Sequence, residues 1–211
     1  MRRVALWSFG FVFGAVAVLA TSASPANAQA ARTVAALPES GSTTAPIGWV
    51  QFCSIAPAEC RQRSSQPRDV VLSPTAFTQL VRLNLAVNNE IEQVSDQELY
   101  GVEEYWTLPT NGKGDCEDIV LEKKRRLILL GWPREALLVT VVRDLRGEGH
   151  AVLTVKTDRG DYVLDNHVNE VKLWNETGYR FVKRQSQSDP NRWVSLNGGG
   201  SSPLLVSQPR R

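Results

Sequence analysis

The chain has 211 residues, of which 42% are hydrophobic, 22% charged and 8% aromatic, which is a globular composition that excludes collagen-like, coiled-coil and wholly disordered classes. It carries 24 Lys and Arg against 22 Asp and Glu. Two of the basic residues are arginines in an N-terminal stretch that we expect to be removed, which leaves 22 basic against 22 acidic residues. A zero net charge argues against a general nucleic-acid binder, so we expect no nucleic-acid partner.

The N-terminus has the order of a secretory signal peptide. Arg2 and Arg3 precede the apolar run 4–20, and Ala26-Asn27-Ala28 forms an A-x-A cleavage site. We predict that residues 1–28 are a signal peptide and that the mature protein is periplasmic. A retained membrane anchor is the alternative, because the 17-residue run reaches the lower limit for a spanning helix.

One domain is predicted between two flexible ends. Residues 29–47 are rich in Ala, Thr, Ser and Gly without a sustained period, which predicts a flexible lead-in. Residues 196–211 contain a run of three glycines and a terminal arginine pair, which predicts a flexible tail. Residues 48–195 are the predicted domain.

Two of the three cysteines are suited to a disulfide. Cys53 and Cys60 lie seven positions apart, so a bond between them would close a short loop around Pro57. A zinc site is the competing interpretation, but zinc usually requires closer ligands and a second Cys or His pair nearby. The spacing favours the disulfide, which leaves Cys116 as a free thiol.

Two helices are predicted in the first half of the domain. Ser73-Pro74 is a typical helix start, and the apolar pattern that follows predicts a helix to about Glu92. A second helix is expected to begin at Asp115 or Cys116 and to end at the Gly131-Trp132-Pro133 sequence.

Three strands are predicted after the helices. Residues 136–142, 151–155 and 162–164 are β-branched or apolar runs separated by glycines, which indicates an antiparallel meander. Helices followed by an antiparallel sheet predict an α+β fold.

A thiol, an imidazole and a carboxylate fall at positions suited to catalysis. Cys116 lies at the expected helix N-terminus, where amide dipoles favour a thiolate and lower the thiol pKa. His150 begins one predicted strand and Asp165 ends the next, so antiparallel pairing brings them within reach of each other. We expect Cys116 as nucleophile, His150 as general base and acid, and Asp165 as the residue that orients the imidazole. A buried structural cysteine, a satisfied histidine and a turn aspartate are the alternatives.

Two further features are interpreted structurally. The run 123–126, which reads Lys-Lys-Arg-Arg, follows Glu122 on the predicted helix and is expected to be a solvated helical face. His167 lies in a loop after Asp165 and is expected at the surface.

The sequence resembles the bacterial transglutaminase-like cysteine proteinases, a group that includes the LapG-type periplasmic proteases. The resemblance covers about residues 46–195. It rests on blocks that occur in the family's order: Phe52-Cys53 with Pro57 and Cys60, Tyr105-Trp106-Thr107-Leu108-Pro109, Gly112-Lys113-Gly114-Asp115-Cys116-Glu117-Asp118, Leu129-Leu130-Gly131-Trp132-Pro133, Gly149-His150-Ala151-Val152-Leu153 and Leu164-Asp165-Asn166. Ile119 departs from the aromatic residue that family members often have there.

The resemblance implies a papain-like, transglutaminase-like core with a Cys-His-Asp triad, which maps onto Cys116, His150 and Asp165. It also implies calcium ligands around the nucleophile, at Asp115, Glu117 and Asp118, although acids in a helix's first turn are also stabilised without a metal. No cofactor is required for the chemistry itself. The implied partners are a protein substrate, such as a large surface adhesin, and a membrane-bound regulator with a periplasmic domain.

We therefore expect an exported cysteine protease that acts through an acyl-enzyme. A transamidase is an alternative that uses the same triad, because an amine can replace water in the second step. A non-catalytic binding module on the same fold is a further alternative.

Overall fold

The computed structural model describes residues 36–196. The predicted signal peptide, and the predicted tail beyond Leu196, lie outside the described residues. Among the described residues, no helix is both long and apolar enough to cross a membrane.

Five α-helices, two short 3-10 helices and nine strands make up the described chain. The helices are α1 (Ile47–Ile55), α2 (Pro57–Cys60), α3 (Pro74–Glu90), α4 (Asp96–Tyr100), α5 (Cys116–Leu129), η1 (Arg134–Ala136) and η2 (Trp174–Glu176). The strands are β1 (Glu39–Thr43), β2 (Glu92–Gln93), β3 (Lys113–Gly114), β4 (Leu137–Arg143), β5 (Gly149–Thr157), β6 (Gly160–Leu164), β7 (Lys172–Leu173), β8 (Arg180–Gln185) and β9 (Trp193–Leu196).

Seven strands form one sheet in the order β1-β9-β8-β4-β5-β6-β7, and every neighbouring pair is antiparallel. The predicted meander is confirmed as β4, β5 and β6, and the α+β class is confirmed with it. The short strands β2 and β3 pair in parallel in a separate ribbon beside the N-terminus of α5. This ribbon matters for the site because β3 ends immediately before the helix that carries Cys116.

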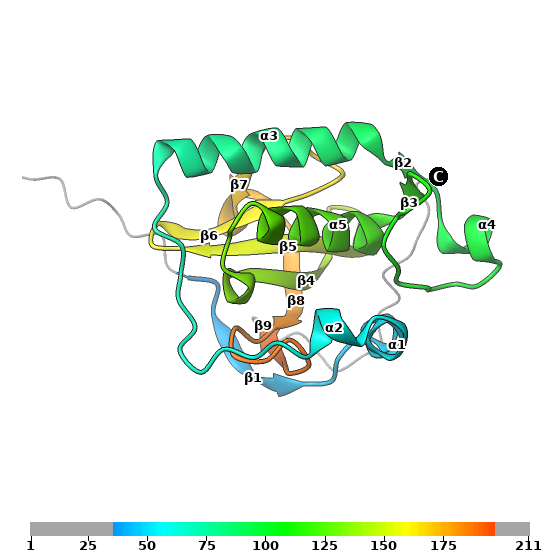
Figure 1. Ribbon diagram of the computed structural model, residues 1–211, viewed down its shortest axis with the longest axis horizontal. Coiled ribbons are helices and arrows are strands. Elements are labelled where there is room, and N and C mark those ends of the chain that lie inside the picture. Colours follow the sequence, from blue (N-terminus) through cyan, green and yellow to red (C-terminus); the bar gives the residue numbers. More distant parts are fainter. Residues whose placement is uncertain (1–35, 197–211) are drawn as a thin grey trace, which may run out of the picture. The chain divides into compact units, whose positions relative to one another are not determined.

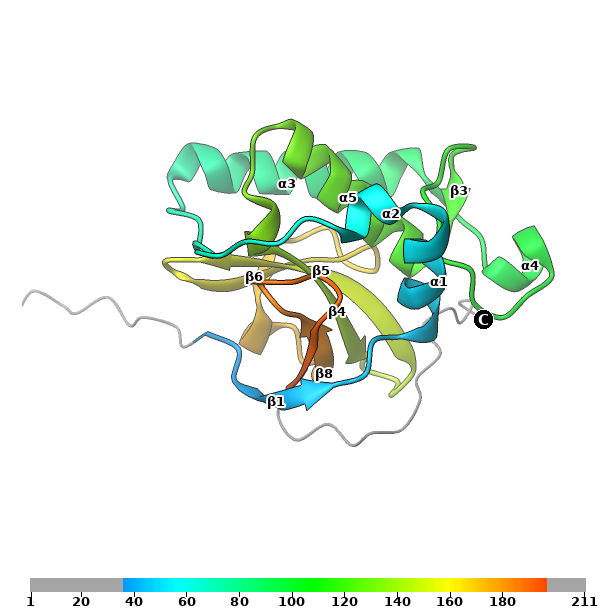
Figure 2. The same ribbon diagram turned by 60° about the horizontal axis from the view of Figure 1, so that its bottom comes forward.

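Helices α3 and α5 lie on the same side of the sheet, with α5 next to the strands (Figure 1). The ring of Phe77 on α3 meets Tyr162 on β6 edge to face, with centroids 5.5 Å apart. A smaller apolar cluster that includes Val152 and Phe181 is separate from this main core. The turned view in Figure 2 brings β1 and β8 forward, below the two helices. The central strand β5 is buried on both faces, which fixes the position of any residue on it.

The helix ends follow the sequence signals. The Ser73 hydroxyl accepts a hydrogen bond from Ala76 N at 3.1 Å, so the predicted N-cap of α3 is confirmed. Helix α5 ends at Leu129, two residues before Gly131, whose φ of 88° favours glycine.

The lead-in prediction is wrong for its last part. Residues Glu39–Thr43 form β1, which pairs with β9, and α1 already begins at Ile47. The sequence shows no period here because β1 is an edge strand with mostly exposed side chains. At the other end, Leu196 belongs to β9 and is buried, so the fold extends by one residue into the predicted tail.

The disulfide prediction is confirmed. Cys53 on α1 and Cys60 on α2 are joined, with a Cα–Cα distance of 5.7 Å. Asn191 Nδ2 donates to the carbonyl of Cys60 at 2.9 Å, which ties this helical pair to the loop before β9. The bond therefore anchors α1 and α2 against the main core, where Trp49 is buried.

The solvated-face prediction for residues 123–126 is wrong for its first half. Lys123 and Lys124 are buried, whereas Arg125 and Arg126 are partly exposed and both pair with Glu122. Helical periodicity turns the first two side chains toward the core and the next two outward.

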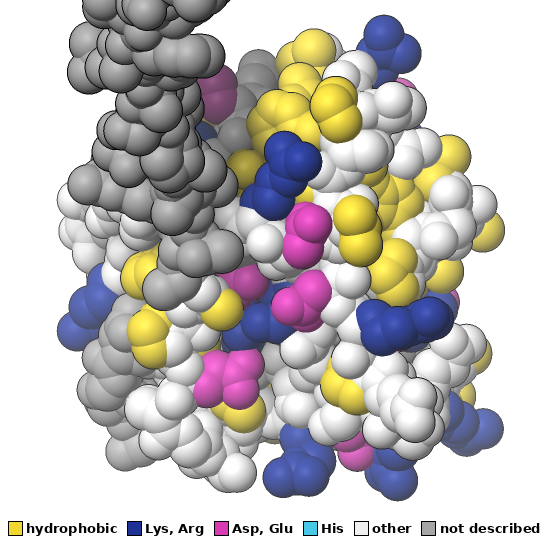
Figure 3. Space-filling model, turned by 90° about the vertical axis from the view of Figure 1, so that its left-hand side faces the viewer, with side chains coloured by type: hydrophobic (Ala, Val, Ile, Leu, Met, Phe, Trp, Pro, Cys, Tyr) yellow, Lys and Arg dark blue, Asp and Glu magenta, His cyan; other side chains and the backbone are white. Residues whose placement is uncertain are grey.

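On the face shown in Figure 3, basic and acidic side chains are interspersed among apolar ones.

Candidate active site

Cys116 is the first residue of α5, at the place the sequence predicts. The preceding turn needs its glycines. Gly112 has a φ of 74°, and a Cβ on Gly114 would come within 2.7 Å of the Asp118 side chain. The Gly-Lys-Gly-Asp-Cys sequence therefore lets β3 pass directly into α5 and places the thiol at the helix N-terminus.

The thiol lies against the start of β5. Ala151 N donates to Cys116 Sγ at 3.4 Å, which places the sulfur beside the residue that follows His150. Within the described residues, Cys116 is the cysteine that lies outside the disulfide, and it is buried. The thiol and the imidazole are thus brought together from two elements that are 34 positions apart in the sequence.

Asp165 follows directly after β6, the antiparallel neighbour of β5. His150 Nε2 and Asp165 Oδ1 are 2.8 Å apart, and both side chains are buried. The structure therefore brings together the three side chains that the sequence singles out. The Asp165 contact assigns the Nε2–H tautomer to the neutral imidazole, because a carboxylate accepts and does not donate. Nδ1 is left available for proton exchange.

Two residues that no local sequence pattern assigns to the site complete the surroundings of the Asp165 carboxylate. Tyr179 OH donates to Asp165 Oδ2 at 2.6 Å, and His167 N donates to Oδ1 at 2.9 Å. Burial alone would raise the pKa of Asp165, but these bonds and the contact with His150 hold it well below its usual value. The carboxylate is consequently ionised at neutral pH.

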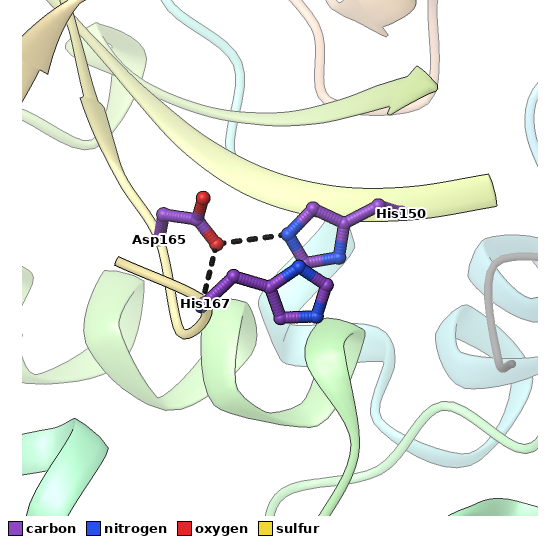
Figure 4. Close-up of side chains that lie close together, drawn as sticks. All are labelled: His150, Asp165 and His167. Carbon is purple, nitrogen blue, oxygen red and sulfur yellow. Dashed lines mark hydrogen bonds and ion pairs between the residues drawn. The ribbon is translucent and has the colours of Figure 1, made fainter. Parts of the chain in front are cut away.

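The prediction for His167 holds only in part: the residue lies in a loop, but it is not fully exposed. Its ring is partly buried and stacks on the ring of His150, with centroids 3.9 Å apart and an angle of 6° between the planes. Figure 4 shows the two rings together, with Asp165 bonded both to the His150 ring and to the backbone nitrogen of His167. The turn after β6 folds back, which places the residue two positions beyond Asp165 over the same imidazole.

The acidic residues around Cys116 oppose the lowering of the thiol pKa that the helix N-terminus is expected to cause. Burial raises the pKa of the Cys116 thiol well above its ordinary value, and the charges of Glu117 and Asp115 raise it further. The thiol also donates to Glu117 Oε2 at 3.2 Å. The sequence prediction of a lowered thiol pKa is therefore not met by these residues alone.

The acids form a cluster that differs by one member from the predicted set. Carboxylate oxygens of Asp96, Asp115 and Glu117 lie within 4.8 Å of one another. Asp96 comes from α4, and its backbone N donates to Asp115 Oδ2 at 3.3 Å. Asp118, the third predicted ligand, lies beside this group rather than in it, because its Oδ1 accepts from Thr107 N. No local pattern links Asp96 to the nucleophile, because Asp96 lies 19 positions before Asp115 and reaches it only through the tertiary fold.

Burial raises the pKa of Asp118 to about 9, and the charges of Asp115 and Asp96 contribute. Carboxylates held this close must bind protons or a cation, because their charges otherwise repel. Several oxygen donors at one place are the ligand type that Ca²⁺ prefers. The cluster thus fits a calcium ion, with Asp96, Asp115 and Glu117 as ligands and Asp118 at its edge.

A cavity of about 360 Å³ opens onto the site and is bordered by Cys116, His150 and His167. A larger hollow of about 920 Å³ lies between α3 and the end of α5, but no cysteine, histidine or carboxylate borders it. The smaller cavity is therefore where a reacting group can meet both the thiol and the imidazole.

Comparison with known proteins agrees with this site. The family model described as bacterial transglutaminase-like cysteine proteinase matches residues 39–201. Calcium-bound LapG of Legionella pneumophila is 20% identical with a TM-score of 0.50, over 65% of this chain and 77% of that chain. Two further LapG structures of that organism each have a TM-score of 0.49. One is 23% identical and covers 63% of this chain and 72% of that chain. The EGTA-treated structure is 21% identical and covers 65% of this chain and 74% of that chain.

No curated protein sequence matches the chain. The likeness to calcium-bound LapG supports a transglutaminase-like core. The family match extends over most of the chain and includes all three candidate catalytic residues. The chain belongs to the family of bacterial transglutaminase-like cysteine proteinases, and it is a cysteine peptidase.

Proposed function

We propose that this peptidase hydrolyses a peptide bond of a protein substrate through Cys116, His150 and Asp165. The observation that carries the proposal is the 2.8 Å contact between His150 Nε2 and Asp165 Oδ1, next to a thiol held at the N-terminus of α5. A positioned imidazole with one nitrogen fixed by a carboxylate is what a thiol nucleophile requires as its base.

In the first step the Cys116 proton passes to His150 Nδ1, and the sulfur attacks the carbonyl carbon of the scissile bond. Backbone amides at the N-terminus of α5 stabilise the negative charge on the carbonyl oxygen. His150 then donates its proton to the departing amine, which leaves an acyl-enzyme on Cys116. Water, deprotonated by His150, attacks the acyl carbon and releases the carboxylic acid product, and the proton returns to the thiol.

We propose Asp96, Asp115 and Glu117 as calcium ligands beside the nucleophile. The three carboxylates lie within 4.8 Å of one another, and two of them raise the thiol pKa. A bound calcium ion supplies positive charge that offsets these carboxylates. Without such charge the thiol stays protonated, and Glu117 keeps its hydrogen bond from Cys116 Sγ.

We also propose that the protein is exported to the periplasm by its N-terminal segment. The charge, apolar core and A-x-A order of residues 1–28 supports export. The family resemblance supports a large surface adhesin as the substrate and a membrane-bound protein as regulator. The disulfide between Cys53 and Cys60 is compatible with an oxidising compartment.

The experiment compares the new protein N-termini that the parent protein and Cys116→Ala produce from surface proteins of the source cells. The reaction is run with calcium and with EGTA, and with a fluorescent primary amine present. Calcium-dependent new N-termini that Cys116→Ala does not produce are expected. Incorporation of the amine without new free carboxylates would instead identify transamidation. A parent protein that produces neither, although folded and calcium-loaded, would contradict the proposal.

A further inference from the structure

The ring of His167 lies on the imidazole of His150, and the mechanism above gives it no role. The two ring planes differ by 6°, and their centroids are 3.9 Å apart. At this distance and angle, one ring covers a face of the other. The rings come from separate elements, because His150 lies on β5 and His167 lies in the turn after β6 (Figure 4). The fold therefore brings a second ring against the general base.

Two other contacts hold the His150 ring. Nε2 lies 2.8 Å from Asp165 Oδ1, and the Tyr179 ring meets the imidazole at 85° with centroids 5.9 Å apart. A hydrogen bond fixes one ring nitrogen but tolerates a range of angles, so it does not alone set the tilt of the ring plane. The tilt decides where Nδ1 points, and Nδ1 must receive the Cys116 proton. A parallel ring in contact with one face sets that tilt.

The cavity beside the thiol offers the imidazole room to turn. Cys116, His150 and His167 all border it, and its volume is about 360 Å³. His150 is 2% exposed, whereas His167 is partly buried. The torsion about the Cβ–Cγ bond of histidine is broad, so an imidazole with one open face can rotate. Removal of the His167 ring would open such a face.

Side-chain amides fix the turn that carries His167. Asn88 on α3 donates from Nδ2 to the Asp165 carbonyl at 2.8 Å, and Gln93 on β2 donates from Nε2 to the Asn166 carbonyl at 3.3 Å. The backbone N of His167 itself donates to Asp165 Oδ1 at 2.9 Å. Surrounding contacts of this kind keep a reacting group in its productive geometry. The His167 ring is therefore presented to the imidazole by an anchored turn.

We propose that His167 is a positioning residue whose ring holds the His150 imidazole at the tilt at which Nδ1 meets the Cys116 thiol. This inference rests on the proposed function and adds one residue to its site. The stacked ring also favours the imidazolium that forms when the thiol gives up its proton, because the face of an aromatic ring attracts a cation. A flat, uncharged ring is sufficient for both effects, so phenylalanine should be able to replace His167.

The test compares His167→Phe, which keeps a flat ring, with His167→Leu, which has apolar bulk without one. Both variants keep the backbone N–H that donates to Asp165, so the change is confined to the side chain. Val168→Ala is the matched control. Val168 lies in the same turn and is also partly buried, but its side chain borders a separate, smaller hollow.

The first readout is the rate at which iodoacetamide alkylates Cys116 in calcium. Cys53 and Cys60 are joined, so alkylation reports Cys116. His167→Leu should react about tenfold more slowly than the parent, whereas His167→Phe and Val168→Ala should stay within about threefold of it. All three should unfold at urea concentrations close to that of the parent, because the substituted side chains are only partly buried.

Two results of this experiment would overturn the proposal. A purely structural His167 predicts that His167→Leu unfolds more easily and alkylates at the parent rate. A His167 that acts through a ring nitrogen predicts that His167→Phe is as slow as His167→Leu. Should His167→Leu fail to fold, His167→Ala takes its place with the same expected rate.

The second readout is proton NMR of the imidazole, which requires no reaction. The chain has two histidines, so each His167 variant has a single imidazole, that of His150. The parent should show a nuclear Overhauser effect between the two rings. The His150 ring protons should be shifted upfield by the stacked ring in the parent and in His167→Phe, and not in His167→Leu. A folded parent without the Overhauser effect would overturn the proposal.

His150→Ala separates this inference from the proposed function. If His150→Ala is alkylated as fast as the parent, the proposed catalytic pair fails, whatever His167 does. If His150→Ala is slow while His167→Leu matches the parent, the catalytic pair stands and the positioning role of His167 alone fails.

Discussion

Replacing Asp118 by asparagine should stabilise the protein when calcium is absent. The side chain is fully buried, its Oδ2 has no hydrogen-bond partner within residues 36–196, and its pKa is raised to about 9. In the unfolded chain the same carboxyl has its ordinary pKa of 3.8. Between these values the folded state holds one proton more than the unfolded state, so stability falls as the pH rises.

The size of the effect follows from the shift. Each pH unit between about 4 and 9 costs about 1.4 kcal/mol, so the upper limit at pH 8 is about 6 kcal/mol. Asparagine has the same shape, keeps an oxygen for the bond from Thr107 N, and does not titrate. Since the amide must also be desolvated, we expect Asp118→Asn to be more stable than the parent by on the order of 3 kcal/mol at pH 8.

The assay is urea unfolding followed by tryptophan fluorescence in EGTA, from pH 5 to pH 8. The free energy of unfolding of Asp118→Asn should exceed that of the parent by an amount that grows with pH. Glu122→Gln is the matched control on the same helix, and it should be less stable than the parent because the loss of its charge removes the ion pairs with Arg125 and Arg126. If the difference in the free energy of unfolding between Asp118→Asn and the parent did not change from pH 5 to pH 8, the raised pKa of Asp118 would be refuted.

Three further predictions concern neighbouring parts of the structure. Glu117→Gln should make Cys116 react several-fold faster with iodoacetamide in EGTA, because it removes a charge that raises the thiol pKa; equal rates would contradict this. Tyr179→Phe should lower kcat/KM about three- to tenfold with little change in KM, because the Asp165 carboxylate loses a hydrogen bond of roughly 1 kcal/mol; an unchanged kcat/KM would contradict this. Reduction of the disulfide between α1 and α2 should lower the free energy of unfolding by about 2.5 kcal/mol, from the closure of so short a loop, as measured by urea unfolding with and without reductant; no change would contradict this.

The parts of the fold that the sequence predicts are those with strong local signals. Ser73-Pro74 marks the start of α3, and glycine-punctuated apolar runs mark β4, β5 and β6. Strand β1 escapes prediction because it is an edge strand with exposed side chains, and its place depends on pairing with β9, about 150 positions away. Such long-range pairing leaves no local pattern.

In the candidate site, too, the residues with local sequence signals are predicted and those that depend on long-range contacts are not. Cys116, His150 and Asp165 are identified because each falls at the end of a predictable element. Asp96 and Tyr179 reach the site through the tertiary fold, so local patterns do not indicate them. The burial of Lys123 follows from helical periodicity, because Lys123 shares the apolar stripe of α5 with Val120 and Leu127.

The most direct test of the account is the reactivity of Cys116. The protein is labelled with a cysteine-directed peptide electrophile in calcium, and the modified residue is mapped by tryptic digestion. His150→Ala is the comparison. We predict rapid modification of Cys116 in the parent and a rate at least about 100-fold lower in His150→Ala. Slow labelling at equal rates in both folded proteins, with and without calcium, would contradict a catalytic Cys116–His150 pair.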